Sequence, residues 1–402
     1  MTRPWSLCVW ERGTGSGHLF HLLPVVDALQ RLGHRVLLCV KDVGLTKRVF
    51  HDSDVVVRPL PVRRETVRGT LARSHAELMF NLGFADPAGQ TRALGRWRQL
   101  MSELRPAAVF CDHADGALLA AYSLGLPAAV LGNGFFHPPV NSPFPAFDPA
   151  VDPGCAALTR VESRILAAVN AALGYCNAPT LDRLADLYAR AWRFVFSFAE
   201  LDAYGSRSGL DYLGLSGPTH RAAAPIWQGA GEKVFFYLSR GQQADPDFVD
   251  QLLGAGYSLL IAAPGLGDDA SGALRRRGVA VANRHVDLQQ VCADCRLVFS
   301  EGNHGTTAKI LRFGRVPLLL PRQLEQLVTA NRLAVQTLGV VPRRSLVGPL
   351  CLQLIDSLNA NPAYERNARL FADRYGGWDE AVCADRVRWA VNDLIRESGP
   401  NP

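Results

Sequence analysis

Two histidines follow a glycine-rich stretch close behind the first apolar run of the chain. The segment GTGSGHLFHLLP, residues 13–24, places His18 and His21 three residues apart after the run WSLCVW. A histidine at the end of a first strand would lie where ligands bind in open α/β folds, and its near-neutral pKa suits a general base. The alternative is a histidine in a first helical turn that only hydrogen-bonds the loop.

The same stretch does not meet the dinucleotide-binding fingerprint. That pattern needs a third glycine that lets the helix approach the strand, but Gly13 and Gly15 are followed by His18 at that position. The second apolar run also ends late for the acidic ribose ligand of this fingerprint, at Lys41-Asp42. We therefore reject a bound dinucleotide and expect a glycine turn that presents His18.

A second polar cluster lies in the segment FSEGNHGTTAKILRFGRVPLLLPRQLEQ, residues 299–326. It combines an imidazole, two hydroxyls and the backbone amides of a helix N-terminus, which suits a pyrophosphate. These residues are His304, Gly305, Thr306 and Thr307. An acid and an amide, Glu325 and Gln326, follow the next apolar run and suit sugar hydroxyls. The cluster predicts a phosphorylated sugar or a nucleotide as ligand.

Short apolar runs alternate with amphipathic segments along the chain, as in a doubly wound parallel α/β sheet. The strands expected in the first half are residues 5–10, 34–40, 54–60, 107–112 and 127–132, with short runs at 193–198 and 210–214. Those expected in the second half are 233–239, 257–265, 278–284, 296–301 and 316–321. The expected helices are 22–33, 116–125, 157–173, 304–314, 323–339, 362–377 and 379–397.

A segment of different composition separates the two halves of the chain. Residues 216–231 are small, contain proline and glycine and show no periodicity, which is typical of a linker. The 402 residues are also too many for one compact core, so we expect two domains.

Composition excludes several classes of protein. Charged residues make up 20% and the net charge is +6, but the longest basic run is only Arg275–Arg277, which argues against a nucleic-acid groove. No apolar leader and no run of about 18–20 apolar residues is present. We expect a cytoplasmic protein without a transmembrane segment, whose mild positive charge would allow peripheral membrane contact at most.

The nine cysteines, an odd number, argue against a disulfide framework. Cys292 and Cys295 form the one close pair, and no second pair follows at the spacing of a zinc site. We expect buried thiols at a helix end, in a reducing cytoplasm, and no metal site.

The two motif segments together resemble those of the inverting GT-B glycosyltransferases of the UDP-glycosyltransferase superfamily, most of all its bacterial natural-product members. The N-terminal motif is matched by Gly17-His18 and by Gly33-His34 before an apolar run. The lipid-linked GlcNAc transferase of peptidoglycan synthesis has a similar opening. The donor motif is matched in order by EGNHGTT, GRVP and PRQLEQ, and the resemblance covers nearly the whole chain.

The resemblance implies two Rossmann-like parallel-sheet domains that face each other across a cleft. Residues 1–218 would bind the acceptor, 219–231 would form the linker, and 232–377 would bind a nucleotide-sugar. Residues 378–402 would form a helix that crosses back to the first domain.

The activity implied is metal-independent, inverting transfer of a sugar from a UDP- or dTDP-sugar to a hydroxyl of a small, hydrophobic or lipid acceptor. No cofactor is implied, and the segments contain no DxD-like acidic pair. His18 matches the base that deprotonates the acceptor, and Asp112 matches its acidic partner. The alternative for Asp112 is the N-cap of the following helix.

The resemblance also assigns binding residues. Thr306 and Thr307 match phosphate contacts, and Glu325 and Gln326 match the pair that grips the sugar. The remaining positions are Ser239 at phosphate, His285 beside the base, and Phe135, Phe136 and His137 in the loop 133–149 that would line the acceptor site. The alternative for this loop is a rigid crossover that packs its own phenylalanines.

Two positions depart from the family pattern. Glu301 replaces the pyrophosphate histidine, a role that His304 can take over if the carboxylate turns away. Lys309 replaces the glutamate that grips the ribose hydroxyls, which suits a 2′-deoxyribose donor, a lysine drawn to the phosphates, or a damaged site. These departures favour the second hypothesis, a nucleotide-binding partner or activator without transferase activity. A sugar-nucleotide epimerase would need more carboxylates than these segments supply.

Overall fold

The chain folds into two compact units in its computed structural model. The structure describes residues 3–62, 66–67, 69–152, 154–217, 222–239, 242, 245–342 and 350–398. Unit 1 comprises Met1–Pro218 and Glu380–Pro402, and unit 2 comprises Thr219–Asp379.

Unit 1 is built on a sheet of six parallel strands in the order β3-β2-β1-β4-β5-β6. The strands are β1 (Trp5–Trp10), β2 (Arg35–Val40), β3 (Val55–Pro59), β4 (Val109–Asp112), β5 (Ala128–Gly132) and β6 (Trp192–Val195). Because β1 lies beside β4 with Trp10 opposite Asp112, the carboxyl ends of these two strands are level.

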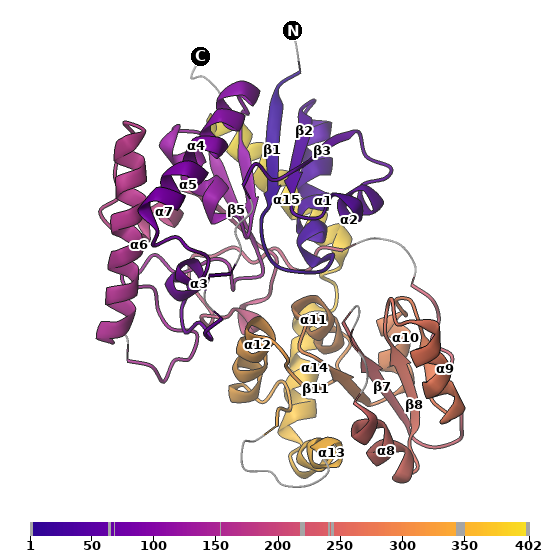
Figure 1. Cartoon of the computed structure of the whole chain (residues 1–402). Helices are drawn as coiled ribbons and strands as arrows, with labels where there is room; N and C mark the ends of the chain where they lie inside the picture. The colour runs from indigo at the N-terminus through magenta and orange to yellow at the C-terminus, as the bar shows by residue number, and fades with distance from the viewer. Residues whose placement is uncertain are drawn as a thin grey trace. The chain divides into compact units, whose positions relative to one another are not determined.

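Helices cover both faces of this sheet. They are α1 (Gly17–Arg31), α2 (Val43–Val49), α3 (His75–Asn81), α4 (Pro87–Leu104), α5 (Asp115–Ser123), α6 (Ala156–Tyr175), α7 (Asp186–Ala189), the 3₁₀ turn η1 (Ala199–Leu201) and α15 (Glu380–Ser398). Figure 1 shows α4, α5 and α6 on one side of the sheet and α1 and α15 on the other, and each side has its own buried apolar cluster.

Unit 2 repeats this plan around five parallel strands in the order β11-β10-β7-β8-β9. The strands are β7 (Lys233–Tyr237), β8 (Ser258–Ala262), β9 (Ala280–Ala282), β10 (Leu297–Ser300) and β11 (Pro317–Leu319). The helices are α8 (Pro246–Gly254), α9 (Asp268–Arg276), α10 (Leu288–Asp294), α11 (His304–Arg312), α12 (Leu324–Val335), α13 (Leu350–Ala360) and α14 (Ala363–Tyr375). The predicted class, two doubly wound parallel α/β units, is confirmed.

The C-terminal helix α15 belongs to unit 1 although unit 2 precedes it in sequence. Its buried residues Cys383, Val387, Val391 and Leu394 pack in the same apolar cluster as α1. The apolar stripe recurs every three to four residues, as expected for one buried helix face.

Several predicted elements differ from those observed. The helix expected at 22–33 begins earlier, at Gly17, so both histidines lie in its first two turns. The run at 210–214 is not a strand, because only Tyr212 makes a bridge, to Val195. Residues 219–221 of the predicted linker and 399–402 of the predicted C-terminal segment lie outside the described residues.

Two expectations from composition can be compared with the described residues. Cys292 and Cys295 are buried at the end of α10, as predicted, and burial raises the pKa of both thiols to about 12. Among the described helices, none combines the length and apolar character needed to cross a bilayer.

Candidate active site

His18 and Asp112 meet at the carboxyl edge of the unit 1 sheet. Asp112 ends β4, and His18 is the second residue of α1, which follows β1 after a short glycine-rich connection. The His18 Nδ1 lies 2.5 Å from Asp112 Oδ1, and the carboxylate is completely buried. Because an ionised carboxylate only accepts hydrogen bonds, Nδ1 carries the proton and Nε2 keeps a lone pair.

Two glycines shape the connection in front of His18. Gly13 and Gly15 both have left-handed backbones, with φ of 86° and 85°, which favour glycine. A Cβ added at Gly13 would lie only 1.9 Å from the His18 Nε2, so the loop backbone packs directly on the imidazole.

The second oxygen of Asp112 is bound by His21. The His21 Nδ1 lies 2.7 Å from Asp112 Oδ2, and its ring stacks on Phe196 with centroids 4.8 Å apart and planes at 8°. Burial opposes ionisation of Asp112, but the charges and hydrogen bonds of His18 and His21 hold its pKa below the usual value. Asp112 does not cap a helix, because α5 begins at Asp115 with Ala114 as its N-cap.

These three side chains are also the one group in the described residues that could hold a metal ion, since one ligand atom of each lies within 4.8 Å of the others. The Nδ1-to-oxygen distances of 2.5 and 2.7 Å are hydrogen-bond lengths, however. The three groups therefore satisfy one another, and the cluster needs no cation to explain it.

Aromatic rings enclose the His18 imidazole. Trp10 stacks at 5.6 Å and Phe136 lies at 5.7 Å, while His113 is 6.1 Å away. His113 itself stacks on Phe136 at 3.6 Å and has a left-handed backbone with φ of 45°, a conformation that is uncommon outside glycine.

Two further histidines near the cluster are neutral at physiological pH. Burial, and then the charge of Arg12, holds the pKa of His113 well below the usual value. Burial also lowers the pKa of His137 strongly, with Arg207 as the next cause. Neither imidazole makes a hydrogen bond within the described part of the chain.

The three predicted acceptor residues are all buried. Phe136 contacts His18, whereas Phe135 stacks on Phe147 of the same loop at 4.6 Å. The carbonyl of His137 accepts a hydrogen bond of 2.7 Å from Arg207. The structure therefore brings only Phe136 into contact with the predicted base.

In unit 2, Glu301 follows β10 and turns toward Ser239, which lies just beyond β7. The Glu301 Oε2 accepts hydrogen bonds from the Ser239 backbone N–H, at 3.0 Å, and from its hydroxyl. The other oxygen, Oε1, forms an ion pair with Arg322 Nε at 3.2 Å. Glu301 is only 1% exposed, whereas the Arg322 side chain is 42% exposed. Solvent therefore reaches the positively charged residue of this ion pair and not the carboxylate.

The amide Gln326 joins this network through Asn303. Its Nε2 donates to Asn303 Oδ1 at 2.8 Å, and the Asn303 Nδ2 donates to the Ser239 hydroxyl at 2.9 Å. The Gln326 Oε1 accepts from the Arg322 N–H at 2.9 Å and takes part in a capping box with Gln323 at the start of α12. In this structure Gln326 thus holds the loop after β11.

Four of the other predicted donor residues, His304, Gly305, Thr306 and Thr307, form the first turn of α11, and Glu325 is the second residue of α12. Gly305 is exposed, Thr306 and Glu325 are partly exposed, and His304 and Thr307 are buried. His285, before α10, stacks on Tyr237 at 6.3 Å, and burial followed by the charge of Lys309 lowers its pKa.

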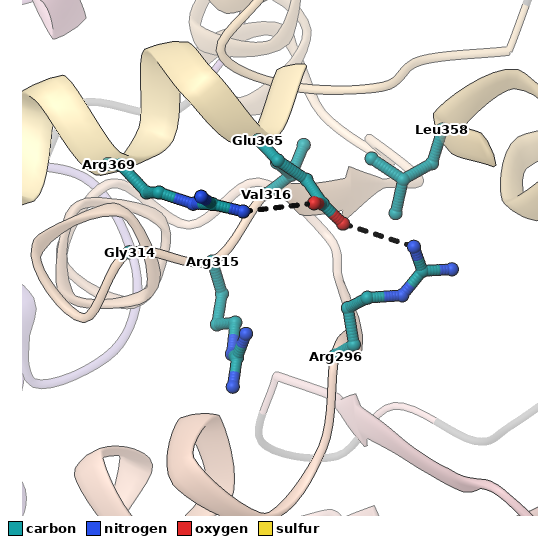
Figure 2. Close-up of a pocket in the computed structure, with 7 residues that line it drawn as sticks. All are labelled: Arg296, Gly314, Arg315, Val316, Leu358, Glu365 and Arg369. Atoms are coloured by element: carbon teal, nitrogen blue, oxygen red, sulfur yellow. Dashed lines mark hydrogen bonds and ion pairs between the residues drawn. The ribbon is translucent and has the colours of Figure 1, made fainter. Parts of the chain in front are cut away.

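Unit 2 also contains a pocket that is lined by four arginine and glutamate side chains together with Gly314, Val316 and Leu358 (Figure 2). Arg296 and Val316, which directly precede β10 and β11, place it at the amino ends of those strands. Glu365 joins two of its arginines, at 3.0 Å to Arg296 and 3.4 Å to Arg369. Since the predicted donor residues follow the carboxyl ends of the strands, this pocket is at the opposite edge.

Three residues of these networks were not among the predicted site residues. The sequence placed His21 one turn after His18, but the shared carboxylate required the pairing of β1 with β4. Asn303 and Arg322 carried no comparable signal beyond their places inside the donor motif.

With this geometry, the chain has the fold of the GT-B natural-product glycosyltransferases. The glycosyltransferase of kitacinnamycin matches with a TM-score of 0.67 and 18% identity, covering 99% of this chain and 100% of that one. CalG4, the calicheamicin glycosyltransferase, matches with a TM-score of 0.66 and 17% identity over 98% and 99%. SsfS6 of Streptomyces sp. SF2575, in complex with thymidine diphosphate, matches with 0.58 and 18% over 96% and 99%. No protein-family model and no curated protein matches the sequence.

Proposed function

We propose that this protein is an inverting glycosyltransferase that transfers a sugar from a UDP- or dTDP-sugar to a hydroxyl of a small acceptor. The observation that carries the proposal is the buried His18–Asp112 pair at the carboxyl edge of the unit 1 sheet. The fold supports it, since the solved structures of the same fold are glycosyltransferases, one of them in complex with thymidine diphosphate.

His18 would act as the general base. Its Nε2 takes the proton of the acceptor hydroxyl while the oxygen attacks the anomeric carbon from the face opposite the nucleotide. The new carbon–oxygen bond forms as the bond to the phosphate oxygen breaks, so the configuration inverts and a nucleoside diphosphate leaves. Asp112 stabilises the imidazolium that results, as the aspartate does in a Ser-His-Asp triad.

We assign the acceptor to unit 1 and the donor to unit 2. Phe136, beside His18, offers the acceptor an apolar face. On unit 2 the donor would meet Thr306 and Thr307 at the start of α11, with His285 near the base and Glu325 and Gln326 at the sugar.

The negative charge of the leaving diphosphate requires compensation, which a metal ion supplies in other transferases. We propose that Arg322 supplies it here, together with the N-terminus of α11. Glu301, the residue that departs from the family pattern, is buried and paired with Arg322, so it holds the guanidinium rather than meeting the phosphates. The reaction is then metal-independent.

A thermal-shift screen with UDP, dTDP, GDP and their sugars tests donor binding, because a ligand that binds only the folded state raises the Tm. A shift with dTDP and none with UDP would fit Lys309 in place of a ribose-binding glutamate. Mass spectrometry of donor and acceptor mixtures with EDTA present then tests transfer, with His18→Ala as the inactive control. The proposal fails if no nucleotide binds the folded protein.

The second candidate is a nucleotide-binding partner protein without transferase activity. The observation that favours it is the use of both Ser239 donors by Glu301, since Ser239 is a predicted phosphate contact. Nucleotide binding without turnover of any donor, in the wild-type protein and in His18→Ala alike, would support this candidate over the transferase.

A further inference from the structure

We infer that His21 is a positioning residue that orients Asp112 and, through it, the base His18. This inference rests on the proposed function for its consequence in catalysis, although its structural part can be tested without any substrate. His21 was not among the residues that the family resemblance assigned.

The geometry places both imidazoles on one carboxylate. His18 and His21 are three residues apart on α1, so they share one helix face, and each directs its Nδ1 at a different oxygen of Asp112. With one donor, a carboxylate can still rotate about its last torsion. With a donor on each oxygen, the plane of the carboxylate is fixed, and so is the direction from which His18 Nδ1 must approach.

His21 is itself held in place. Its ring lies almost parallel to Phe196, which directly follows β6, and the side chain is 13% exposed. The ring is therefore clamped between a side chain of the sheet edge and the carboxylate. This is the arrangement expected of a group that fixes another, since its own rotamer is locked by packing.

Burial makes the second donor necessary. Asp112 is 0% exposed, so an oxygen without a donor could not be satisfied by bulk water. His21 also withdraws part of the carboxylate charge from His18, because its N–H stabilises the same ion. Losing the His21 N–H should therefore raise the pKa of His18 and allow its neutral ring to populate both tautomers.

Other charged and titratable groups also surround the cluster and would influence the titration of its histidines. From the connection after β4 these include His113, and from the loop 133–149 His137. The nearby cations are Arg12, Arg193 and Arg207. All five remain unchanged in the variants below, so differences between those variants report on position 21.

Two substitutions separate the hydrogen bond from the ring. His21→Phe keeps a ring that can stack on Phe196 but removes the donor to Asp112. His21→Asn removes the ring but keeps a side-chain N–H two bonds from Cβ, where the imidazole has its Nδ1. If His21 acts through Asp112, His21→Asn should keep the properties of the wild type. If the ring only fills space, His21→Phe should keep them instead.

The first readout is the ¹⁵N spectrum of the histidine rings in the substrate-free protein, recorded against pH. We expect wild-type His18 and His21 both to carry the neutral proton on Nδ1. In His21→Phe the His18 signal should move toward a mixture of tautomers and titrate at higher pH, while His21→Asn should resemble the wild type. A wild-type spectrum with the proton of either ring on Nε2 would overturn the inference, even if a variant failed to fold.

The second readout is kinetic and uses any donor and acceptor pair that the wild type turns over. We expect kcat to fall about tenfold in His21→Phe with KM for the acceptor unchanged, the effect of losing one hydrogen bond to a charged group. His21→Asn should stay within about threefold of wild type. Equal losses in the two variants would overturn the inference. An inactive wild type with the expected spectra would instead count against the proposed function alone.

Discussion

Gly13 and His18 are packed so closely that the loop admits no side chain at position 13. A Cβ there would lie 1.9 Å from the His18 Nε2, the atom that would receive the acceptor proton. The glycine-rich connection thus packs directly on His18, the proposed base, and its backbone forms one wall around the imidazole.

Gly13→Ala should therefore lower kcat strongly by displacing His18. Gly15→Ala is the matched control, because its φ of 85° matches the 86° of Gly13 but a Cβ there meets nothing within 4 Å. Both variants should lose about 1–2 kcal/mol of stability from the left-handed backbone. Only Gly13→Ala should also lose about 100-fold or more in kcat, the contribution of a general base. Equal kcat values for the two variants would contradict this role of Gly13.

The pKa of Asp112 predicts how stability depends on pH. Because its pKa is lower in the folded chain than usual, the ionised carboxylate stabilises the folded state above about pH 4, and this contribution is lost as the pH falls through the folded value. Asp112→Asn should lower the free energy of unfolding by about 2 kcal/mol at pH 7.

Urea unfolding of wild type and Asp112→Asn at pH 7 and pH 3 measures that difference. The gap between their free energies of unfolding should narrow at pH 3, because pH 3 lies below the ordinary carboxyl pKa and the contribution of the lowered pKa is lost as the pH falls further. Asp27→Asn is the control, since Asp27 lies on the same helix α1 but forms an exposed pair with Arg31, worth about 0–1 kcal/mol. A gap of equal size at both pH values would argue against the predicted ionisation.

Most of the unit 1 site could be predicted from the sequence, because His18 lies at the start of a helix and Asp112 at the end of a strand. The apolar run before Asp112 and the glycines before His18 predicted a strand end and a helix start, and neighbouring parallel strands bring such ends together. The role of His21 could not be read in the same way. It depends on the rotation of α1 over the sheet, which places position 21 on the face toward Asp112.

The unit 2 network was less predictable for a physical reason. Ser239, Glu301 and Arg322 follow three different strands, β7, β10 and β11, and their contacts depend on strand order in the sheet. From the sequence, Glu301 was only a carboxylate in an unfavourable place. In the structure the positive charge of Arg322, which lies 21 positions further along the chain, compensates this carboxylate.

Helices in the region between β3 and β4 were not predicted, although local signals existed. Ser74 and Asp86 cap α3 and α4 with side-chain hydrogen bonds, and Pro87 occupies the first turn of α4. Conversely, the apolar run 210–214 looked like a strand but makes one bridge only. The Tyr212 hydroxyl donates a hydrogen bond of 2.8 Å to Asp202 instead, and this bond holds the segment in its loop conformation.

Substitution by alanine should change stability in opposite directions at Gly302 and Gly305, although the two positions are only one turn apart. Gly302 has a φ of 87°, and a Cβ there would lie 3.2 Å from the Gln326 carbonyl oxygen, whereas Gly305 is in α11 with nothing within 4 Å. Gly302→Ala should destabilise unit 2 by about 1–2 kcal/mol. Gly305→Ala should be neutral or stabilise by up to about 1 kcal/mol through helix propensity. Thermal unfolding of both variants checks the signs, and a stabilising Gly302→Ala would contradict the observed backbone.

Arg322→Ala should weaken binding of a nucleoside diphosphate without affecting the nucleoside. Under the proposed function the guanidinium meets the phosphates, and a lost charge-assisted hydrogen bond corresponds to about a tenfold rise in Kd. Calorimetric titration with dTDP and with thymidine, or with UDP and uridine if those bind, separates the two contributions. The thymidine or uridine affinity should remain within about twofold of wild type.

Arg369→Ala is the control for this test. It removes the same charge from unit 2, but Arg369 lines the pocket at the opposite edge of the sheet (Figure 2). Its diphosphate affinity should match the wild type. Glu301→Gln supplies the second comparison, because releasing Arg322 should weaken dTDP binding, whereas a carboxylate that only repelled the phosphates would strengthen binding when neutralised. Tighter dTDP binding in Glu301→Gln, with no change in Arg322→Ala, would exclude the role assigned to this ion pair.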